Sequence, residues 1–229
     1  MKKQYNTIIL SDIHLGSDNC NAKALNSLLE KLIDKQIIIE RLILNGDVFD
    51  SLDFRRLKKN HWKVLSNIRH LSDKIDVVWI CGNHDVAADI ISHLIGVSIV
   101  EDFIFTSGGK NIYVSHGHQY DDFLDKHPII TYFADCIYWI LQKIDPSHFI
   151  SKFAKHNSKT FVRCTKKVEI GATKKAKEKE CHIAICGHTH SPEITKNDGI
   201  IYCNSGCWTE KNCTYLAIKD GAITLESFS

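Results

Sequence analysis

Five short apolar runs, each ending abruptly in a polar loop, constrain the fold of this 229-residue chain more than any other feature. The runs are rich in β-branched side chains, and such runs are typical of buried strands. They occupy residues 7–10, 41–44, 77–81, 112–114 and 183–186. The sequence therefore predicts at least five buried strands, each followed by a polar loop.

Helical patterns lie between some of these strands. Residues 22–35 place their apolar side chains on one helical stripe, and residues 57–71 do so with looser periodicity. Alternation of strands and helices predicts an α/β architecture. Because ligands of such sheets bind beyond the carboxyl ends of the strands, we expect the five polar loops to converge on one site. The apolar stripe expected for the second helix consists of Leu57, Trp62, Leu65, Ile68 and Leu71.

Residues 121–180 interrupt the alternation. They carry a helical pattern rich in aromatic side chains and then a basic stretch, since residues 152–179 hold ten Lys or Arg and two Glu. Beyond them, residues 200–203, 215–218 and 222–225 predict a terminal set of antiparallel strands, with Asp220-Gly221 as a hairpin turn. We expect a single domain over residues 1–229 with a helical cap insertion at about 121–180.

Composition restricts the class of protein. The formal net charge of +2 does not point to a polyanionic partner. Nine Cys without a C-x-x-C pair, and a first apolar run that ends at Asp12, predict a reduced cytoplasmic protein rather than an exported disulfide scaffold. Cys203, Cys207 and Cys213 are an alternative zinc set, which their spacing disfavours. The apolar stretch 129–141 is too short to span a bilayer.

The polar loops supply a set of side chains typical of metal ligands. Two Asp, one Asn and four His, without Cys, suit Mn²⁺, Fe or Zn²⁺. Seven ligands are too many for one tetrahedral ion and fit two ions if one carboxylate bridges them. Two ions roughly 3.5–4 Å apart clamp a phosphoryl group and supply hydroxide near neutral pH. The seven residues are Asp12, His14, Asp47, Asn83, His116, His188 and His190.

Taken together, five motifs resemble the signature blocks of calcineurin-like metallophosphoesterases. The resemblance covers residues 7–206, and it implies a β-sandwich of two mixed sheets flanked by helices. The alternative, that each motif is only a turn or a surface loop, is disfavoured because all five follow a predicted strand. The motifs are Ser11-Asp12-Ile13-His14, Asn45-Gly46-Asp47-Val48-Phe49-Asp50, Gly82-Asn83-His84-Asp85, Ser115-His116-Gly117-His118 and Gly187-His188-Thr189-His190.

The resemblance also implies roles for these residues. Two divalent ions are expected, with Mn²⁺ favoured and Fe or Zn²⁺ as alternatives, and a hydroxide that bridges them attacks the phosphorus. His84 lies near the leaving group as a general acid or as a donor to the phosphoryl oxygens, and Asp50 orients it; a surface carboxylate is the other interpretation of Asp50. One ion takes Asp12, His14, Asp47 and His190, and the other takes Asp47, Asn83, His116 and His188.

Within the superfamily, the chain most resembles UDP-2,3-diacylglucosamine pyrophosphatases. The small size, the early Asp-x-His, the helical insertion, Ser191-Pro192 and the segment 202–210 carry this resemblance. It implies hydrolysis of a lipid-linked UDP-sugar with release of UMP in the lipid A pathway. The protein would then be cytoplasmic and peripheral to the inner face of the membrane.

The insertion offers candidate substrate contacts. Phe133 and Ile137 belong to an apolar stripe that is expected to bind acyl chains, and Arg163 and Lys167 are expected to face a diphosphate. The basic helix would lie on anionic headgroups. The alternative is that the stripe packs on the domain and that the lysines form a solvated helix face.

His84 departs from the lipid A enzymes, which carry Arg after the Gly-Asn of the third block. A general phosphodiesterase acting on a soluble nucleotide or a nucleic acid is therefore the main alternative. Nucleic acid is disfavoured because the basic residues lie in one insertion beside many apolar ones. A scaffold that has lost its metals is disfavoured because the ligand set is complete. No obligate protein partner is inferred.

Overall fold

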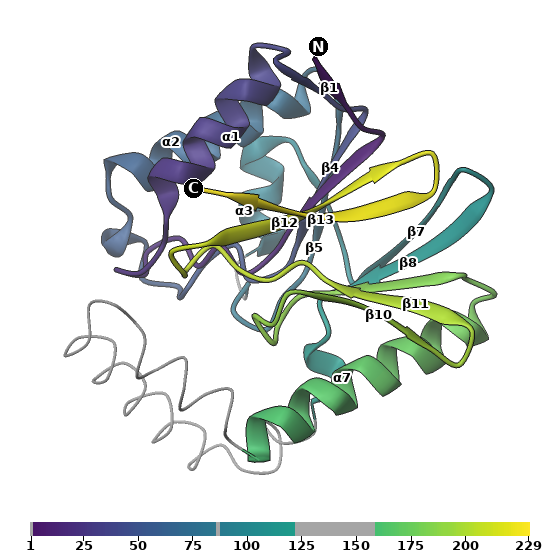
Figure 1. Cartoon of the computed structure of the whole chain (residues 1–229). Helices are drawn as coiled ribbons and strands as arrows, with labels where there is room; N and C mark the ends of the chain where they lie inside the picture. Colours follow the sequence, from purple (N-terminus) through teal and green to yellow (C-terminus); the bar gives the residue numbers. More distant parts are fainter. Residues whose placement is uncertain (1, 86–87, 122–158) are drawn as a thin grey trace.

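Two mixed β-sheets pack face to face, and helices cover their outer faces (Figure 1). The computed structural model describes residues 2–85, 88–121 and 159–229. Each sheet contains both parallel and antiparallel neighbours. The prediction of an α/β sandwich of two mixed sheets is therefore confirmed.

The larger sheet has six strands. Its centre is parallel, because β2, β4, β5 and β6 run in one direction, while the last two strands form an antiparallel hairpin that adds to the edge of β2. In spatial order the strands are β13 (Ala222–Phe228), β12 (Cys213–Lys219), β2 (Thr7–Leu10), β4 (Arg41–Asn45), β5 (Asp76–Ile80) and β6 (Ser98–Val100).

The smaller sheet has five strands, of which β8, β9 and β11 are parallel. A short parallel pair, β1 (Lys3–Gln4) with β3 (Ile37–Ile38), stands apart from both sheets. In spatial order the five strands are β10 (Glu193–Asn197), β11 (Ile200–Asn204), β9 (Ile183–Cys186), β8 (Lys110–Ser115) and β7 (Asp102–Ser107).

Helices α1 (Ala22–Ile33), α2 (Lys59–Ser72) and α3 (Ala88–Ile95) pack on the outer face of the six-stranded sheet. Helix α7 (Lys159–Glu178) packs on the outer face of the five-stranded sheet (Figure 1). Two short 3-10 helices lie in the connections, and these are η1 (Phe54–Arg56) and η2 (His118–Tyr120).

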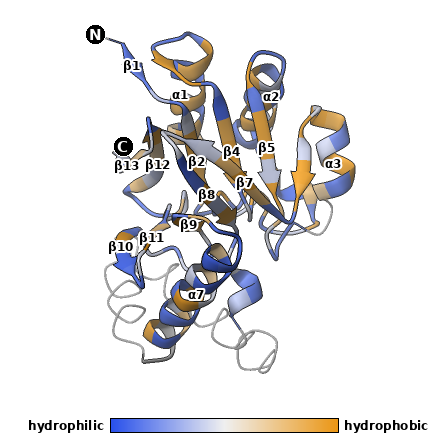
Figure 2. Cartoon of the chain, turned by 90° about the vertical axis from the view of Figure 1, so that its right-hand side faces the viewer, coloured by the Kyte–Doolittle hydropathy of each residue, from blue (hydrophilic) through white to orange (hydrophobic). Residues whose placement is uncertain are grey.

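The core has three layers because successive side chains of a strand point to opposite faces. In β2, Ile8 and Leu10 pack against the helices, whereas Ile9 packs between the two sheets. All three side chains are fully buried. Figure 2 shows hydrophobic residues along β4, and every residue of β2 is buried, so the strand is covered on both faces. This two-sided burial explains why the strands appear in the sequence as continuous apolar runs.

The predicted helices are present, with one error in the second. The pattern over 22–35 corresponds to α1, and the pattern over 57–71 corresponds to α2. The prediction that Trp62 lies in the core is wrong, since this side chain is 55% exposed. The neighbouring His61 is buried instead, because adjacent helical positions lie about 100° apart and only one can join the stripe.

The predicted terminal set of antiparallel strands is also wrong in part. β11 pairs in parallel with β9 and lies in the five-stranded sheet, whereas β12 and β13 form a hairpin in the other sheet. The predicted turn of that hairpin is present, and Asp220 and Gly221 have φ of 49° and 75° as its geometry requires. The last strands of the chain therefore complete both sheets.

The predicted insertion at 121–180 is described only in its last part. Residues 159–178 form α7, as the helical pattern indicated, and residues 122–158 lie outside the described residues. Within the described ranges, none of the helices combines the length and the apolar character needed to cross a bilayer.

The stability of variants can test which face of α2 is buried. Ile68 is fully buried, so Ile68→Ala is expected to lower the free energy of unfolding by about 2–5 kcal/mol. The larger truncation Trp62→Ala is expected to change it by only about 0.5 kcal/mol, because an exposed side chain gains little on folding. Urea denaturation of both variants measures the difference, and a larger loss for Trp62→Ala would contradict the assignment of faces.

Candidate metal centre

The polar loops that follow β2, β4, β5, β8 and β9 meet at the carboxyl ends of these strands, as expected. Main-chain hydrogen bonds join them in pairs. Asp12 N donates to Gly46 O at 3.1 Å, and Gly187 N donates to His116 O at 2.9 Å. Two pairs of loops are thus joined through the main chain alone.

Five of the predicted ligands have a left-handed backbone conformation, which is rare outside glycine. Such a residue costs on the order of 1–3 kcal/mol and persists only where the surrounding structure enforces it. The hydrogen-bonded loops and the buried strands on either side supply that constraint. The φ angles are 53° at Asp12, 51° at His14, 52° at Asp47, 64° at His188 and 53° at His190.

Asp12, His14 and His190 form one group whose potential ligand atoms all lie within 4.8 Å of one another. His190 Nε2 is 3.1 Å from Asp12 Oδ1 and 3.3 Å from His14 Nε2. Asp12 is fully buried. The structure thus brings together three residues predicted to bind the same ion, from loops separated by about 175 residues of sequence.

Asp47, His116 and His188 form a second group of the same kind. His116 Nε2 is 3.3 Å from Asp47 Oδ2, while His116 Nδ1 lies 2.8 Å from the carbonyl oxygen of Asn45. A carbonyl accepts a hydrogen bond, so Nδ1 carries a hydrogen. This arrangement directs Nε2 toward the carboxylate and presents it as a ligand atom.

Asp47 belongs to more than one group. It also forms a group with His14 and His84, and its Oδ2 lies 3.8 Å from His14 Nε2. Its other oxygen accepts a hydrogen bond from His84 N at 2.9 Å. The carboxylate of Asp47 therefore lies between the His14 side and the His116 side of the cluster, where a bridging ligand must be.

The donor set fits divalent cations. Asp12 Oδ1, His14 Nδ1 and His116 Nε2 are buried and, among the described residues, form no hydrogen bond of regular geometry, although they lie 3.1, 3.7 and 3.3 Å, respectively, from a neighbouring side chain. Buried polar atoms normally find partners, and an absent metal ion is one explanation for those that do not. The same groups contain no cysteine, and the eight described cysteines are free thiols, so the alternative zinc set of Cys203, Cys207 and Cys213 gains no support.

Charge is concentrated in this cluster. Burial opposes ionisation of Asp12, but His190 and His116 outweigh it and lower the pKa of Asp12 to about 2. Burial likewise opposes protonation of His116, but Asp47 and Asp12 outweigh it and raise the pKa of His116 to about 9. Buried carboxylates thus hold a proton on an imidazole in the absence of another cation, and metal binding would displace that proton.

Two glycines allow the loops to approach one another closely. A Cβ atom on Gly82 would lie 2.2 Å from Asp47 N, and one on Gly187 would lie 2.5 Å from Asp12 Oδ2. Both distances are far below van der Waals contact. Glycine precedes Asn83 and His188 because any side chain there would displace a predicted metal ligand.

The sequence matches the calcineurin-like phosphoesterase superfamily domain over residues 6–129, which is more than half of the chain. This chain belongs to that superfamily. The cluster of Asp and His side chains lies where the superfamily motifs of the sequence converge, so the chain is classed as a metal-dependent phosphoesterase. No curated protein matched the sequence.

Three solved structures share the fold of this calcineurin-like phosphoesterase at low sequence identity. The first is an archaeal phosphodiesterase, with 12% identity, a TM-score of 0.52, and 96% of this chain and 98% of that chain covered. The second is a mutant Vps29 from Entamoeba histolytica, with 14% identity, a TM-score of 0.51, and 96% of this chain and 97% of that chain covered. The third is Yfce, a phosphoesterase from E. coli, with 15% identity, a TM-score of 0.50, and 97% of this chain and 99% of that chain covered. These similarities establish the sandwich and not a substrate.

Two further predicted residues lie in the loops of this phosphoesterase. The side chains of Asn83 and His84 are exposed in the loop after β5. His84 Nδ1 lies 3.0 Å from the main-chain oxygen of Asp50, whereas the Asp50 carboxylate lies 3.7 Å from His14 Nδ1 and 2.6 Å from Arg56 Nη1. The roles of Asn83 as a ligand and of Asp50 in orienting His84 stay predictions.

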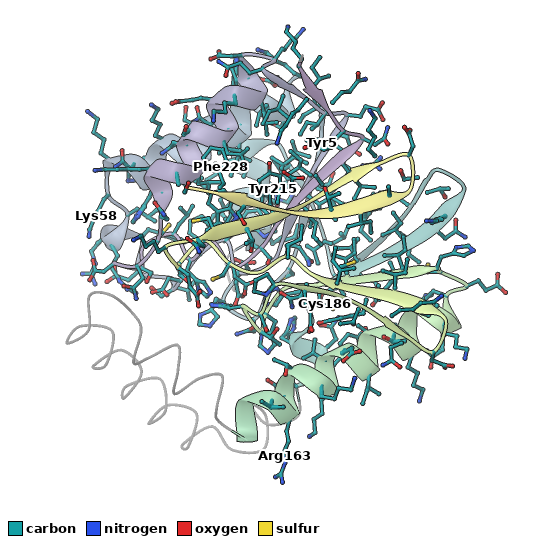
Figure 3. All side chains as sticks on the ribbon, in the orientation of Figure 1. Tyr5, Lys58, Arg163, Cys186, Tyr215 and Phe228 are labelled. Carbon is teal, nitrogen blue, oxygen red and sulfur yellow. The ribbon has the colours of Figure 1, made fainter. Side chains whose placement is uncertain are left out.

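The predicted substrate contacts lie on α7 or outside the described residues, and their roles stay predictions. Arg163 and Lys167 are exposed on α7. Arg163 lies at the end of this helix and projects away from the sheets (Figure 3). Phe133 and Ile137 belong to residues 122–158, so their predicted role is not described by the structure.

Sequence reasoning missed two carboxylates. Asp85 is buried and accepts hydrogen bonds from Phe49 N at 3.1 Å, Trp79 Nε1 at 3.1 Å and Gly82 N at 3.0 Å. Asp121 lies 3.2 Å from His188 Nε2. The only signal for Asp85 is its place directly after Gly-Asn-His, and nothing in the sequence distinguishes Asp121 from other acidic residues.

Asp85 should be required for a correctly formed centre, because it ties the loop after β4 to the loop after β5. Asp85→Asn places an NH₂ donor against a main-chain or indole donor. The expected loss is about 1–3 kcal/mol of unfolding free energy, together with weaker Mn²⁺ binding. Denaturation and calorimetric titration measure both. The exposed Asp76→Asn is the matched control, and equal behaviour of the two variants would contradict the role.

Proposed function

We propose that the chain is a metal-dependent phosphodiesterase that hydrolyses a small soluble phosphodiester or nucleotide at a centre holding two divalent ions. The observation that carries the proposal is the shared carboxylate of Asp47, which approaches His14 at 3.8 Å and His116 at 3.3 Å. A bridging carboxylate is what a pair of ions requires. Two bound ions would neutralise the phosphate and supply a nucleophile near neutral pH.

Under this proposal, one set of side chains binds the metal ions, and His84 acts on the substrate. The buried carboxylates and imidazoles hold the ions and keep them at a fixed separation. His84 is exposed at the edge of this cluster, with its Nδ1 beside the Asp50 carbonyl. The opposite ring nitrogen is then accessible to substrate, and in the doubly protonated ring it can donate to a phosphoryl oxygen or to the leaving group.

A matched pair of carboxylate variants tests this function. Asp47→Asn should abolish Mn²⁺-dependent hydrolysis of bis(p-nitrophenyl) phosphate, because losing the shared ligand removes several kcal/mol of transition-state stabilisation, or about a thousandfold in rate. Asp53→Asn changes an exposed carboxylate on the same connection and should keep activity within about twofold. Metal-free wild-type protein should be inactive and recover with Mn²⁺.

Two outcomes would contradict the proposal. One is full activity of Asp47→Asn, and the other is wild-type protein that binds no metal and hydrolyses no phosphodiester. The second outcome would instead favour the metal-free scaffold.

A lipid-linked UDP-sugar is the second candidate substrate, and one feature of α7 favours it. Val162 and Ile170 are each 53% exposed and lie eight residues apart on the helix. Arg163, Lys167 and Lys174 are exposed on the same helix. Apolar side chains among cations are typical of surfaces that lie on anionic membranes. A cytoplasmic location peripheral to the membrane belongs to this candidate and stays a prediction.

The two candidates differ in their expected response to substitutions on α7. If the substrate is lipid-linked, the double variant Val162→Ser/Ile170→Ser should lose UMP release from UDP-2,3-diacylglucosamine and keep hydrolysis of bis(p-nitrophenyl) phosphate. Ile104→Ser, an exposed apolar position on β7, is the control. Absence of UMP release by the wild type, with a soluble diester hydrolysed, would eliminate the lipid candidate. Binding of single-stranded RNA that weakens steeply with salt would instead support a nucleic acid.

A further inference from the structure

Asp121 is a buried carboxylate beside the cluster to which the proposed chemistry assigns no role. It directly follows η2 and is 7% exposed. Its Oδ2 lies 3.2 Å from Nε2 of His188, and the two side chains are 9% and 10% exposed. A carboxylate this close to an imidazole and this well shielded from water forms a hydrogen bond stronger than an exposed pair would form.

Asp121 contacts Nε2 of the His188 ring and does not belong to the second group. His188 shares that group with Asp47 and His116, and Asp121 is not one of its members. The carboxylate of Asp121 thus contacts the His188 ring without lying within 4.8 Å of all three potential ligand atoms, as a fourth member of the group would. An imidazole has two nitrogens, and a carboxylate on Nε2 leaves Nδ1 for the opposite side.

His116 has the same arrangement with the nitrogens exchanged. Its Nδ1 donates to the Asn45 carbonyl, and its Nε2 faces Asp47. Metal-binding histidines commonly donate their second N–H to a carbonyl or carboxylate, which fixes the tautomer and the orientation of the ring. Asn45 serves His116 in this way, and Asp121 is positioned to do the same for His188.

Packing of η2 against α7 holds Asp121 in place. A Cβ atom on Gly171 of α7 would lie 2.6 Å from the ring of Tyr120, so the two elements are in close contact. Cys164 of α7 is also a neighbour, since burial and the Asp121 carboxylate raise the pKa of its thiol to about 11. The carboxylate is therefore fixed from the helix side as well as from the sheet side.

We propose that Asp121 is a positioning residue of the metal centre. Its carboxylate accepts the Nε2 hydrogen of His188, which selects one tautomer and turns Nδ1 toward the ion shared with Asp47 and His116. The proposal rests on the proposed function only in taking His188 as a metal ligand.

Nitrogen NMR of metal-free, ¹⁵N-histidine-labelled protein tests the tautomer without any measurement of activity. The wild type should show His188 with a protonated Nε2 and an unprotonated Nδ1, assigned by loss of these signals in His188→Gln. Asp121→Ala should convert this signal to a mixture of tautomers. Asp121→Asn should retain more of it, because the amide oxygen still accepts a hydrogen bond. A wild-type His188 protonated on Nδ1 would overturn the proposal.

Metal binding supplies the second measurement. Mn²⁺ affinity should fall about 10–100-fold in Asp121→Ala and less in Asp121→Asn, with two ions still bound at saturation. Asp198→Asn removes a carboxylate that contacts α7 in the exposed Lys177–Asp198 pair, and this variant should bind Mn²⁺ as the wild type does. Unchanged affinity in Asp121→Ala would overturn the proposal. Loss of one ion from Asp121→Asn would also overturn it, because Asp121 would then be a ligand itself.

These outcomes are separable from failure of the proposed function. A wild-type protein that shows the Nε2–H tautomer and binds two ions, yet hydrolyses no phosphodiester, would leave the role of Asp121 intact. If Asp121→Ala does not fold, as judged by circular dichroism, the comparison of Asp121→Asn with Asp198→Asn decides the question.

Discussion

The carboxylates of Asp12 and Asp47 lie buried in one cluster of imidazoles, and the rest of the structure depends on this arrangement. Burying two like charges costs several kcal/mol unless cations face them. In the metal-free protein that requirement is met by histidines, which keep both carboxylates ionised and hold a proton on His116. A pair of divalent ions would compensate the charge of the carboxylates better than the histidines do, because each ion brings two positive charges to the point where the carboxylates converge. The cluster therefore suits cations, and under the proposed function a phosphate held by those cations would complete the balance of charge.

Bringing these ligands together requires strained backbone conformations, which the rest of the fold must stabilise. Five candidate ligands adopt left-handed backbone conformations, and Gly82 and Gly187 leave no room for a side chain. Such local strain is stable only on a rigid base. The base consists of central strands that are buried on both faces, with one face against the helices and the other between the sheets. Asp85 then joins neighbouring loops with hydrogen bonds to Phe49, Trp79 and Gly82. Strand packing and the hydrogen bonds of Asp85 together stabilise the strained loops that carry the candidate ligands.

Sequence reasoning succeeded where the signal was local or periodic. The strands that carry the loops, the stripe of α1 and the hairpin turn at Asp220-Gly221 follow from side-chain spacing and from turn chemistry. Sequence reasoning failed where the burial of a residue or the pairing of a strand depended on residues far away in the sequence. Trp62 has the apolar character of a core residue, yet the adjacent His61 occupies the buried position. The run at 200–203 predicts a strand correctly, but only contact with β9 makes it a parallel member of the second sheet.

The sequence by itself supplied the candidate ligands of the centre, since ligands of α/β proteins bind beyond the carboxyl ends of the strands and polar residues follow five buried runs. The number of candidate ligands predicted two metals, which no single loop implies, and the family motifs implied how the ligands are divided between them. Tertiary structure decided what each group faces. Asp47 lies between two sets of imidazoles, the Asp50 carboxylate lies beside His14 and Arg56, and Asp121 lies behind His188. Except for the pair of Asp50 and Arg56, these relations join residues more than thirty positions apart, and no spacing rule encodes them. They arise because the sheets and α7 fix each backbone in space, and a side chain can contact only what that frame brings within a few ångströms.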